Sequence, residues 1–351
     1  MEEIISIRKF NEINIKDTFF DSLIEDYPEF PKWFQRKSQC DADAYVQYKE
    51  DGTIQAFLYM KDESNEPLTD VIPNRPACRR LKVGTFKIDA HNTKLGERFI
   101  KKILDKGIVE NYDEIYVTIF PKHIGLVNLL TKYGFQQAGS KGEELVLIKD
   151  LKSLSGDILK DYPLVDISHN RKFLLAIYPK YHTRLFPDSI LRNENKYELI
   201  KDVNYTNSIH KIYLCFMSGT ASLRKGDLLV IYRTNDYLGP AKYRSVVTSV
   251  CQVEEVKTKR NFANVADFIS YTNKYSIFDN GELANWFSTK KELVVIKMTY
   301  NIALTKRVTR QYLLDEVGIS SSIYWGFFQL SDDQFNSIIA KGEINENIII
   351  R

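Results

Sequence analysis

The sequence has no apolar run long enough to cross a membrane. A membrane-spanning helix needs about 20 consecutive, mostly apolar residues, and no stretch of the chain approaches that length. The N-terminal segment MEEIISIRKF has two glutamates directly after Met1 and lacks an apolar core, so we expect no secretory signal there. These absences predict a cytoplasmic protein that does not bind a membrane.

Cysteine is also scarce. The four cysteines are far apart and form no C-x-x-C pair; they are Cys40, Cys78, Cys215 and Cys251. This spacing predicts neither a disulfide framework nor a structural zinc site, and it fits a reducing compartment. We expect each cysteine to be a small apolar core residue, and we predict no metal site.

The chain of 351 residues exceeds the usual size of one domain, and 44% hydrophobic and 27% charged residues are ordinary for a globular protein. We predict one domain at 1–151, a linker at 152–166 and a second domain at 167–351. Residues 1–150 carry 22 Lys and Arg against 25 Asp and Glu, whereas residues 151–351 carry 27 against 21. This mild asymmetry permits a polyanionic partner for the second half, although a solvated surface explains it equally well.

Strands and helices alternate in the first half, which predicts an α+β fold. Alternating apolar residues predict strands at Ile4–Phe10, Ala44–Tyr48, Thr53–Lys61, Arg80–Ile88, Glu114–Phe120 and Glu144–Lys149. Helical spacing predicts helices at Lys16–Asp26, around Trp33 and Phe34, at Leu95–Lys106 and at Gly125–Tyr133. Glu50-Asp51-Gly52 predicts a hairpin turn that needs a positive φ, and Gly134 is expected to end the last helix.

This order of elements resembles the GNAT acetyltransferase fold over nearly the whole first domain. The segment LKVGTFKIDAHNTKLGERFIKKIL, residues 81–104, is similar to the family's strand, loop and helix that grip the coenzyme pyrophosphate. EIYVTIF resembles the fifth strand, and NLLTKYGFQQAG resembles the end of the closing helix. The resemblance implies a mixed central sheet with helices on both faces and an acetyl-CoA-dependent N-acetyltransferase.

The coenzyme site is predicted where the long helix begins. The family pattern Gln/Arg-x-x-Gly-x-Gly/Ala places its glycines at Lys94 and Gly96, so only the second is kept. N–H groups at a helix start bind anions, glycine permits close approach, and Lys94 or Arg98 would add positive charge. Alternatively, Gly96 is simply a tolerated glycine. The resemblance implies acetyl-CoA binding by Phe86, Lys87, Ile88, Lys94, Leu95, Gly96, Glu97 and Arg98, with a backbone N–H around Phe86–Ile88 meeting the thioester oxygen.

Proton transfer requires further side chains. An amine nucleophile must lose its proton, so a base is expected. In many relatives a tyrosine four residues before the glycine of "GF" protonates the leaving thiolate, and here that position is Leu130. The catalytic candidates are Asp89, His91, His123 and Tyr133. Each is also explained as an ordinary structural or surface residue, and water or weak catalysis would remove the need for some of them.

Strands dominate the second half. They are predicted at Phe173–Ile177, Lys211–Phe216, Asp227–Arg233, Val246–Val256, Glu292–Tyr300 and Ile323–Gln329. Helices are predicted at Tyr181–Leu185, Val265–Thr272, Thr309–Val317 and Asp332–Ala340. This pattern predicts a small mixed β-barrel with helices at its rim.

Several segments of this half resemble the PUA-like superfamily, in particular its ASCH and EVE members. They are FLLAIYPKYHTRLF, KIYLCF, LRKGDLLVIYRT, YRSVVTSVCQVEEV and YWGFFQLSDDQF. The resemblance implies RNA binding or recognition of a flipped-out base. Basic side chains neutralise phosphates and tyrosines stack on bases, although a solvated charged face is the simpler explanation for any single residue. The nucleic-acid-binding candidates are Lys180, Tyr181, His182, Arg184, Arg233, Lys242, Arg244, Arg307 and Arg310, with Lys306 nearby.

Three functions follow from these resemblances. The first is an acetyltransferase acting on a nucleic-acid-linked amine, such as tRNA or aminoacyl-tRNA, that the second domain delivers. Fusions of this kind look like bacterial toxin–antitoxin or defence components, which would make an antitoxin protein a partner. The alternatives are a protein lysine or N-terminal acetyltransferase, and a non-catalytic RNA-binding protein that senses acetyl-CoA; Leu130 and Lys94 keep the last one open.

Overall fold

The computed structural model describes residues 5–89, 94–187 and 208–350. The chain divides into two units, Met1–Lys152 and Ser153–Arg351. Within the described ranges, no helix is both long and apolar enough to cross a membrane. No group of three or more His, Cys, Asp or Glu side chains there is arranged to hold a metal ion.

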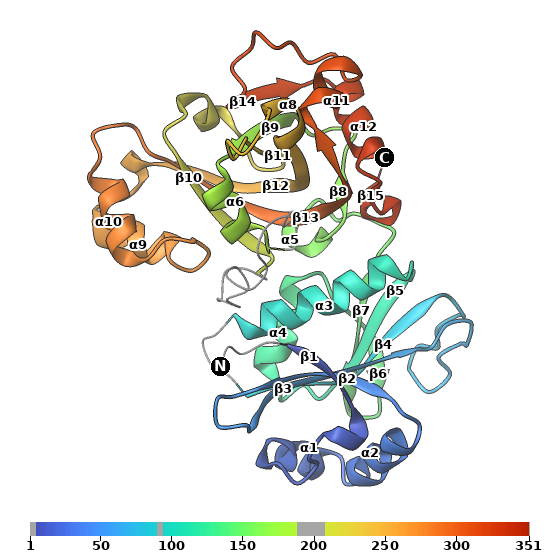
Figure 1. Ribbon diagram of the computed structural model, residues 1–351. Helices are drawn as coiled ribbons and strands as arrows, with labels where there is room; N and C mark the ends of the chain where they lie inside the picture. Colours follow the sequence, from blue (N-terminus) through green and yellow to red (C-terminus); the bar gives the residue numbers. More distant parts are fainter. Residues whose placement is uncertain (1–4, 90–93, 188–207, 351) are drawn as a thin grey trace. The chain divides into compact units, whose positions relative to one another are not determined.

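The first unit is built on a seven-stranded sheet with the order β1-β2-β3-β4-β5-β7-β6 (Figure 1). Its strands are β1 (Ser6–Lys9), β2 (Asp43–Tyr48), β3 (Ile54–Asp62), β4 (Arg80–Ile88), β5 (Glu114–Ile119), β6 (Gln136–Lys141) and β7 (Glu144–Asp150). All neighbouring strands are antiparallel except β4 and β5, which run parallel. The sheet is therefore mixed, as the sequence predicts.

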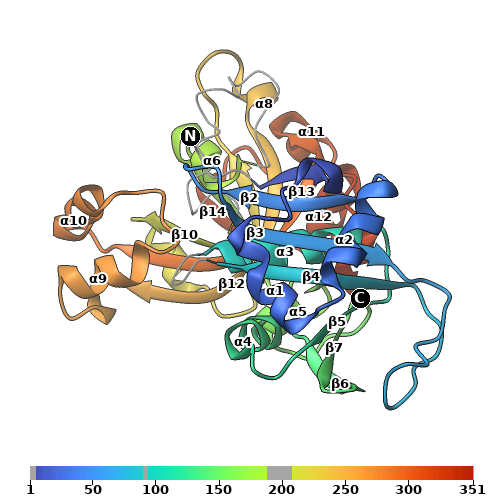
Figure 2. The same cartoon turned by 90° about the horizontal axis from the view of Figure 1, so that it is seen from below.

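Helices cover both faces of this sheet (Figures 1 and 2). The 3-10 turns η1 (Phe10–Glu12) and η2 (Thr18–Phe20) lead into α1 (Asp21–Asp26) and α2 (Phe30–Gln39) on one face. The helices α3 (Leu95–Val109) and α4 (Ile124–Lys132) lie on the other. Gly134 ends α4 with a φ of 87°, as predicted, because a residue without a Cβ adopts this conformation at little cost.

An aromatic core fixes the α1–α2 face. Phe10 lies at the centre, with ring centroids 4.8 Å from Phe34, 5.6 Å from Phe57 and 5.3 Å from Tyr59. On the α3 face, Phe86 of β4 packs 5.9 Å from Phe99. Aromatic side chains of β3 thus pack against the α1–α2 face, and Phe86 of β4 packs against α3 on the other face.

The second unit contains a six-stranded sheet with the order β10-β13-β12-β11-β9-β14. The strands are β9 (Lys172–Ile177), β10 (His210–Cys215), β11 (Leu228–Arg233), β12 (Val246–Thr258), β13 (Val294–Thr309) and β14 (Phe327–Leu330). Helical segments surround it: α5 (Ile158–Asp161), α6 (Pro179–Leu185), η4 (Ser218–Ser222), α8 (Ala241–Arg244), η5 (Lys259–Asn261), α9 (Val265–Thr272), α10 (Asn280–Ser288), α11 (Arg310–Asp315), α12 (Asp332–Lys341) and η6 (Glu346–Ile348).

The expectations of a closed barrel and of four buried cysteines need correction here. In the part of the chain that the structure describes, β10 and β14 are edge strands that do not pair, so the sheet is open and no closed barrel is found. Within the segment expected as a linker, residues 153–166 belong to the second unit: β8 (Val165–Asp166) pairs with β15 (Ile349–Ile350), and Tyr162 Oη donates to Tyr300 O at 3.0 Å. Among the cysteines, Cys215 and Cys251 are buried, but Cys40 is exposed and Cys78 is partly exposed.

Candidate functional site

The parallel strands β4 and β5 separate before either strand ends. Their pairing runs from Arg80 opposite Glu114 to Val83 opposite Val117, whereas β4 continues to Ile88 and β5 to Ile119. A register shift between β3 and β4 leaves Gly84 as an extra, bulged residue. Beyond it, the side of β4 that faces β5 has no partner strand among the described residues, so its backbone can hydrogen-bond an extended ligand.

The ring of Tyr59 leaves no room for a Cβ at the bulge. A Cβ on Gly84 would lie 2.8 Å from the ring of Tyr59, so close packing requires glycine at this position. The loop 90–93 that follows β4 contains the candidate His91 and lies outside the described residues. The structure therefore does not place His91.

The N-terminus of α3 follows this loop. Its intrahelical hydrogen bonds begin with Arg98 N donating to Lys94 O at 3.2 Å, and Lys94 is the N-cap. The side chains of Leu95, Glu97 and Arg98 are buried. Among the cofactor-binding candidates from Lys94 to Arg98, Lys94 and Gly96 are partly exposed. An anion would therefore contact Lys94 and the backbone rather than the Arg98 side chain.

Packing between α3 and α4 explains two of these residues. A Cβ on Gly96 would lie 2.7 Å from Leu129 Cδ2, so glycine at this position lets α4 approach α3. Glu97 accepts a hydrogen bond from Lys132 Nζ of α4 at 2.6 Å. Both contacts are structural: the approach of Leu129 explains glycine at position 96 without a coenzyme, and the contact with Lys132 explains Glu97.

The three candidates on β4 point to opposite faces. Phe86 packs on Phe99, whereas Lys87 Nζ donates to Phe19 O and, at 2.6 Å, to Ser22 Oγ on the α1 face. Burial lowers the pKa of Lys87, and the carboxylates of Asp89, Asp21, Asp26 and Glu25 oppose this shift. The Lys87 side chain therefore connects α1 to the part of β4 that is not paired with β5. Because the side chain is engaged in these contacts, Lys87 would contact a coenzyme through its backbone.

A second set of polar contacts ties the end of α1 to the end of β5. His123, the N-cap of α4, places Nε2 2.9 Å from Asp26 Oδ2, and Lys122 Nζ donates to Asp26 Oδ1. Beside them, Tyr27 Oη donates to Glu144 Oε1 at 2.5 Å. Burial would raise the pKa of Asp26, but the hydrogen bonds from Lys122 and His123 outweigh it and hold that pKa below its ordinary value. Asp26 is thus an ionised, largely buried partner of His123.

The remaining catalytic candidates lie in different surroundings. Asp89 is exposed at the end of β4, with its carboxylate 4.0 Å from Lys49 Nζ. Tyr133 and Leu130 are both fully buried. Among the described catalytic candidates, His123 is the one whose side chain is both partly exposed and oriented by a hydrogen-bond partner. That partner, Asp26, was missed by sequence reasoning.

In the second unit, several basic candidates gather at one end of the sheet. Here β9 and β11 end side by side, with Ile177 opposite Arg233, and β12 begins opposite Arg233 at Val246. We call this region the Arg233 end. Its basic side chains are Arg233, Arg244, Arg307 and Arg310, with Lys242 exposed on α8 and Lys180 exposed on α6.

Some candidates at this end are structural rather than exposed. His182 is fully buried and its Nε2 lies 2.8 Å from Thr248 Oγ1. Arg244 makes two hydrogen bonds to Asp236, one of them at 2.5 Å, and this lowers the pKa of Asp236 to about 2. Tyr181 packs against Phe278, and Arg184 Nη2 donates to Ile277 O. These contacts stabilise the structure at this end of the sheet. A ligand bound there would contact the exposed side chains instead.

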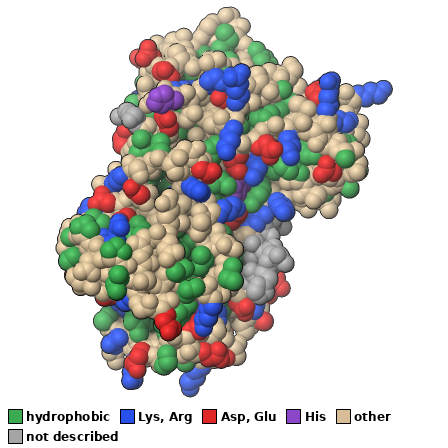
Figure 3. Space-filling model, turned by 180° about the vertical axis from the view of Figure 1, so that it is seen from behind, with side chains coloured by type: hydrophobic (Ala, Val, Ile, Leu, Met, Phe, Trp, Pro, Cys, Tyr) green, Lys and Arg blue, Asp and Glu red, His purple; other side chains and the backbone are tan. Residues whose placement is uncertain are grey.

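Exposed aromatic side chains lie at the same end. Among the described residues of the second unit, the exposed aromatic side chains are Tyr178, Tyr237, Tyr243 and Tyr324. Tyr178 directly follows β9, Tyr237 and Tyr243 belong to the connection between β11 and β12, and Tyr324 precedes β14, whose start pairs with the end of β9. Arg310 also lies 4.4 Å from the ring of Trp325. On the face shown in Figure 3, basic and acidic side chains are interspersed.

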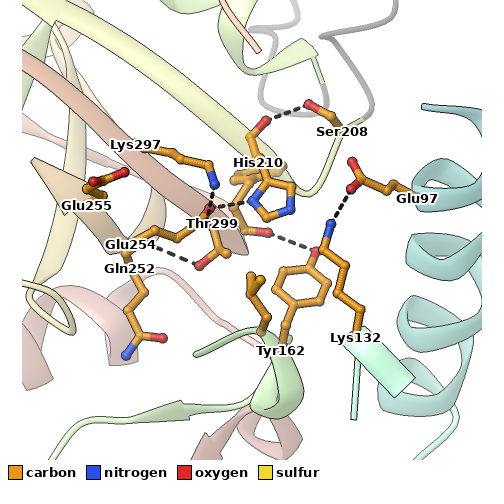
Figure 4. Close-up of polar contacts among 12 residues, drawn as sticks. Glu97, Lys132, Tyr162, Ser208, His210, Gln252, Glu254, Glu255, Lys297 and Thr299 are labelled. Carbon is orange, nitrogen blue, oxygen red and sulfur yellow. Dashed lines mark hydrogen bonds and ion pairs between the residues drawn. The ribbon is translucent and has the colours of Figure 1, made fainter. Parts of the chain in front are cut away.

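A buried charged network lies in another part of the second unit. Glu254 Oε2 is 2.9 Å from Lys297 Nζ, and its other oxygen contacts His210 Nδ1 (Figure 4). Burial would raise the pKa of Glu254, but these two partners lower it. Glu254 and Lys297 line a hollow of about 550 Å³ together with Asp157, Lys225 and Glu255. Sequence reasoning gave His210 no role, because its partner Glu254 is distant along the chain.

No family model matches the sequence, and no curated protein matches it. Solved structures similar to the chain are of two kinds. The ASCH protein of Zymomonas mobilis is 8% identical, with 48% of this chain and 94% of that chain covered at a TM-score of 0.33.

The others are N-acetyltransferases. PseH of Campylobacter jejuni, in complex with acetyl coenzyme A, is 8% identical and covers 42% of this chain and 99% of its own at a TM-score of 0.29. PaiA of Thermoplasma acidophilum, in complex with coenzyme A, is 13% identical, with 42% and 99% covered at a TM-score of 0.30. Both families that the sequence resembles are thus among the similar structures. Because the scores are low, a functional assignment must rest on this chain's own geometry.

Proposed function

We propose that the chain is an acetyl-CoA-dependent N-acetyltransferase whose first unit carries out the reaction. The observation that supports this most is the separation of β4 and β5 beyond Val83 and Val117. It leaves a bulged backbone edge beside the start of α3. The coenzyme arm contains amide groups that suit such an edge, and its pyrophosphate suits a helix N-terminus.

The residues present fit this coenzyme in part. The backbone of Phe86, Lys87 and Ile88 would hold the arm, and the backbone around Gly96 with the Lys94 side chain would hold the pyrophosphate. Bound there, the coenzyme supplies an acetyl thioester. A backbone N–H of the bulged strand would stabilise charge on the thioester oxygen. The buried side chains of Leu95, Glu97 and Arg98 take no part.

Calorimetry tests this proposal directly. We expect acetyl-CoA to bind, and Lys94→Glu to weaken binding about tenfold, since it reverses a charge beside the pyrophosphate. The same variant should bind acetyl-pantetheine, which lacks the pyrophosphate, as well as the native protein does. Lys106→Glu, in the last turn of α3, is the matched control and should bind acetyl-CoA normally. Absence of acetyl-CoA binding by the native protein would reject the proposal.

The second candidate function concerns the Arg233 end. We propose that it binds a single-stranded nucleic acid, and that the acceptor amine is carried on such a substrate, for example tRNA or aminoacyl-tRNA. Support comes from the exposed tyrosines and cations that share this end, because tyrosines stack on bases while Lys and Arg neutralise phosphates. Label from radioactive acetyl-CoA should then enter total cell RNA; label in protein alone would favour a protein acetyltransferase.

Removing two tyrosines should separate stacking from a general charge effect. We expect Tyr237→Ala with Tyr243→Ala to weaken binding of a fluorescent single-stranded RNA by about 30-fold or more, at 1–3 kcal/mol for each base stacked. The matching pair of phenylalanine variants should keep most of the affinity, because phenylalanine retains the ring. Fluorescence anisotropy at one fixed salt concentration measures both. Equal affinity for all three proteins would contradict stacking at this end.

A further inference from the structure

The segment from η2 to the end of α1 connects the two strands that separate. At one end, Lys87 of β4 is hydrogen-bonded to Phe19 O and Ser22 Oγ. At the other end, Asp26 contacts His123, which follows β5 in the chain. Lys87 lies on β4 beyond the last residue paired with β5. The Asp26–His123 pair is therefore held at the open end of this strand pair, on the α1 face.

The pair has the arrangement of a histidine base with an orienting carboxylate. Asp26 has only 10% of its side chain exposed, whereas His123 has 41% exposed. When Asp26 accepts the Nε2–H of His123 at 2.9 Å, Nδ1 of the neutral ring carries the lone pair. No described residue hydrogen-bonds this nitrogen. A carboxylate fixes both the ring orientation and its tautomer in this way, and it stabilises the imidazolium that forms.

We propose that His123, positioned by Asp26, accepts the proton of the acceptor amine; this inference rests on the proposed acetyltransferase function. The acceptor nitrogen forms a bond to the acetyl carbon as the carbon–sulfur bond of the thioester breaks. The proton lost by nitrogen passes to His123 Nδ1, and the departing sulfur takes a proton from water. His123 then returns its proton to solvent, through its exposed side. Tyr133 is fully buried and is not required in this sequence.

Other charged groups around the pair will also affect its pH dependence. Lys122 from the same loop bonds Asp26, and Glu144 of β7 bonds Tyr27 beside it. On α1, Asp21 and Glu25 are exposed, and Lys87 of β4 lies near both. A change in the pH profile must therefore be compared between variants that leave these groups in place.

The test uses the full chain with acetyl-CoA and two acceptors, bulk aminoacyl-tRNA and a lysine peptide, and measures release of the coenzyme thiol. We expect His123→Gln to lower kcat about 100-fold near neutral pH while the Kd for acetyl-CoA stays within twofold. The loss should shrink as pH rises, because an amine that is already deprotonated needs no base. Asp26→Asn should lower kcat less and move the acid limb of the kcat/KM profile to lower pH, since a neutral amide stabilises the imidazolium less.

The chain provides a matched control in the second unit. His169 Nδ1 lies 3.1 Å from Asp166 Oδ2, and this pair is exposed to solvent. His169→Gln should leave both kcat and its pH profile unchanged. If His123→Gln keeps native kcat at every pH, the inference is wrong although acetyl transfer stands. A third outcome is that acetyl-CoA binds but neither acceptor, total RNA nor total protein becomes acetylated. Acetyl transfer would then be rejected, and the role of His123 with it. If acetyl-CoA does not bind, the proposed function fails first.

Discussion

Replacing Arg80 by alanine is expected to lower the free energy of unfolding of the first unit by about 3–5 kcal/mol. Arg80 is 1% exposed and its Nε donates to Glu114 Oε1 at 2.5 Å. The other guanidinium nitrogens donate to Glu66 O at 3.2 Å and Pro76 O at 2.9 Å. Alanine would leave the largely buried Glu114 carboxylate paired with the cation of Arg75, which is 31% exposed and 3.1 Å away. Urea denaturation, with hydrogen exchange of the β5 amides, reports this unit separately.

A double variant shows whether charge or shape causes this loss. Arg80→Met with Glu114→Leu removes both charges and fills similar space, so we expect it to recover at least half of the stability lost by Arg80→Ala. Full recovery is not expected, because the carbonyls of Glu66 and Pro76 still lose their donor. If Arg80→Ala and the double variant are equally unstable, the buried ion pair is not the main contribution. Arg80 and Glu114 are also the first pair in the β4–β5 register, so they hold the strands together at the end opposite the opening.

Lowering the pH from 7.5 to 5.0 is expected to destabilise the second unit by about 2 kcal/mol through His182 alone. Burial, followed by the charges of Arg233 and Arg307, lowers the pKa of His182 from 6.5 to about 3. The folded state thus keeps His182 neutral while the unfolded chain takes up a proton below pH 6.5. The stability is complete above that pH and is lost as pH falls from 6.5 towards 3. Few Asp and Glu residues titrate above pH 5, so the window isolates histidine.

The comparison needs a variant without this titration. In His182→Gln, the same pH change should lower the free energy of unfolding by about 2 kcal/mol less than in the native protein, which is the amount assigned to His182. His182→Asn provides a second variant if glutamine does not fit beside Thr248. Urea denaturation with tryptophan fluorescence is suitable, because two of the three tryptophans, Trp286 and Trp325, lie in the second unit. Equal pH dependence in native and variant proteins would show that His182 is protonated in the folded state.

Local patterns predicted many elements closely. The bounds Arg80–Ile88 of β4 and Val265–Thr272 of α9 agree with the prediction, and α3 begins at Leu95 as expected. These segments combine regular periodicity with clear flanking signals. β6 was missed because Gln136–Lys141 has little apolar alternation, and its pairing with β7 creates the strand. α10 was also missed, although Asp279 and Glu282 form a capping box that marks its start.

The candidate site was less predictable. His123 was recognised as a candidate, but Asp26 and Glu144 were not, and no local signal could have indicated them. Asp26 is separated from His123 by 97 positions in the sequence. Conversely, the resemblance implied that Glu97 and Arg98 bind the coenzyme, yet helix packing buries their side chains. A motif specifies which residues occur near a helix start, whereas the neighbouring helix decides which of them reach a ligand.

The sequence by itself determined the periodicities, the caps and turns, and hence the mixed α+β order of the first unit and the strand-rich second unit. These features depend on residues within a few positions of one another, so they are readable along the chain. Only the tertiary structure decided where β4 parts from β5, that the second sheet stays open among the described residues, and that Asp26 meets His123. Each of these depends on pairing between distant segments, which is selected by the packing free energy of the whole unit and leaves no mark in local sequence.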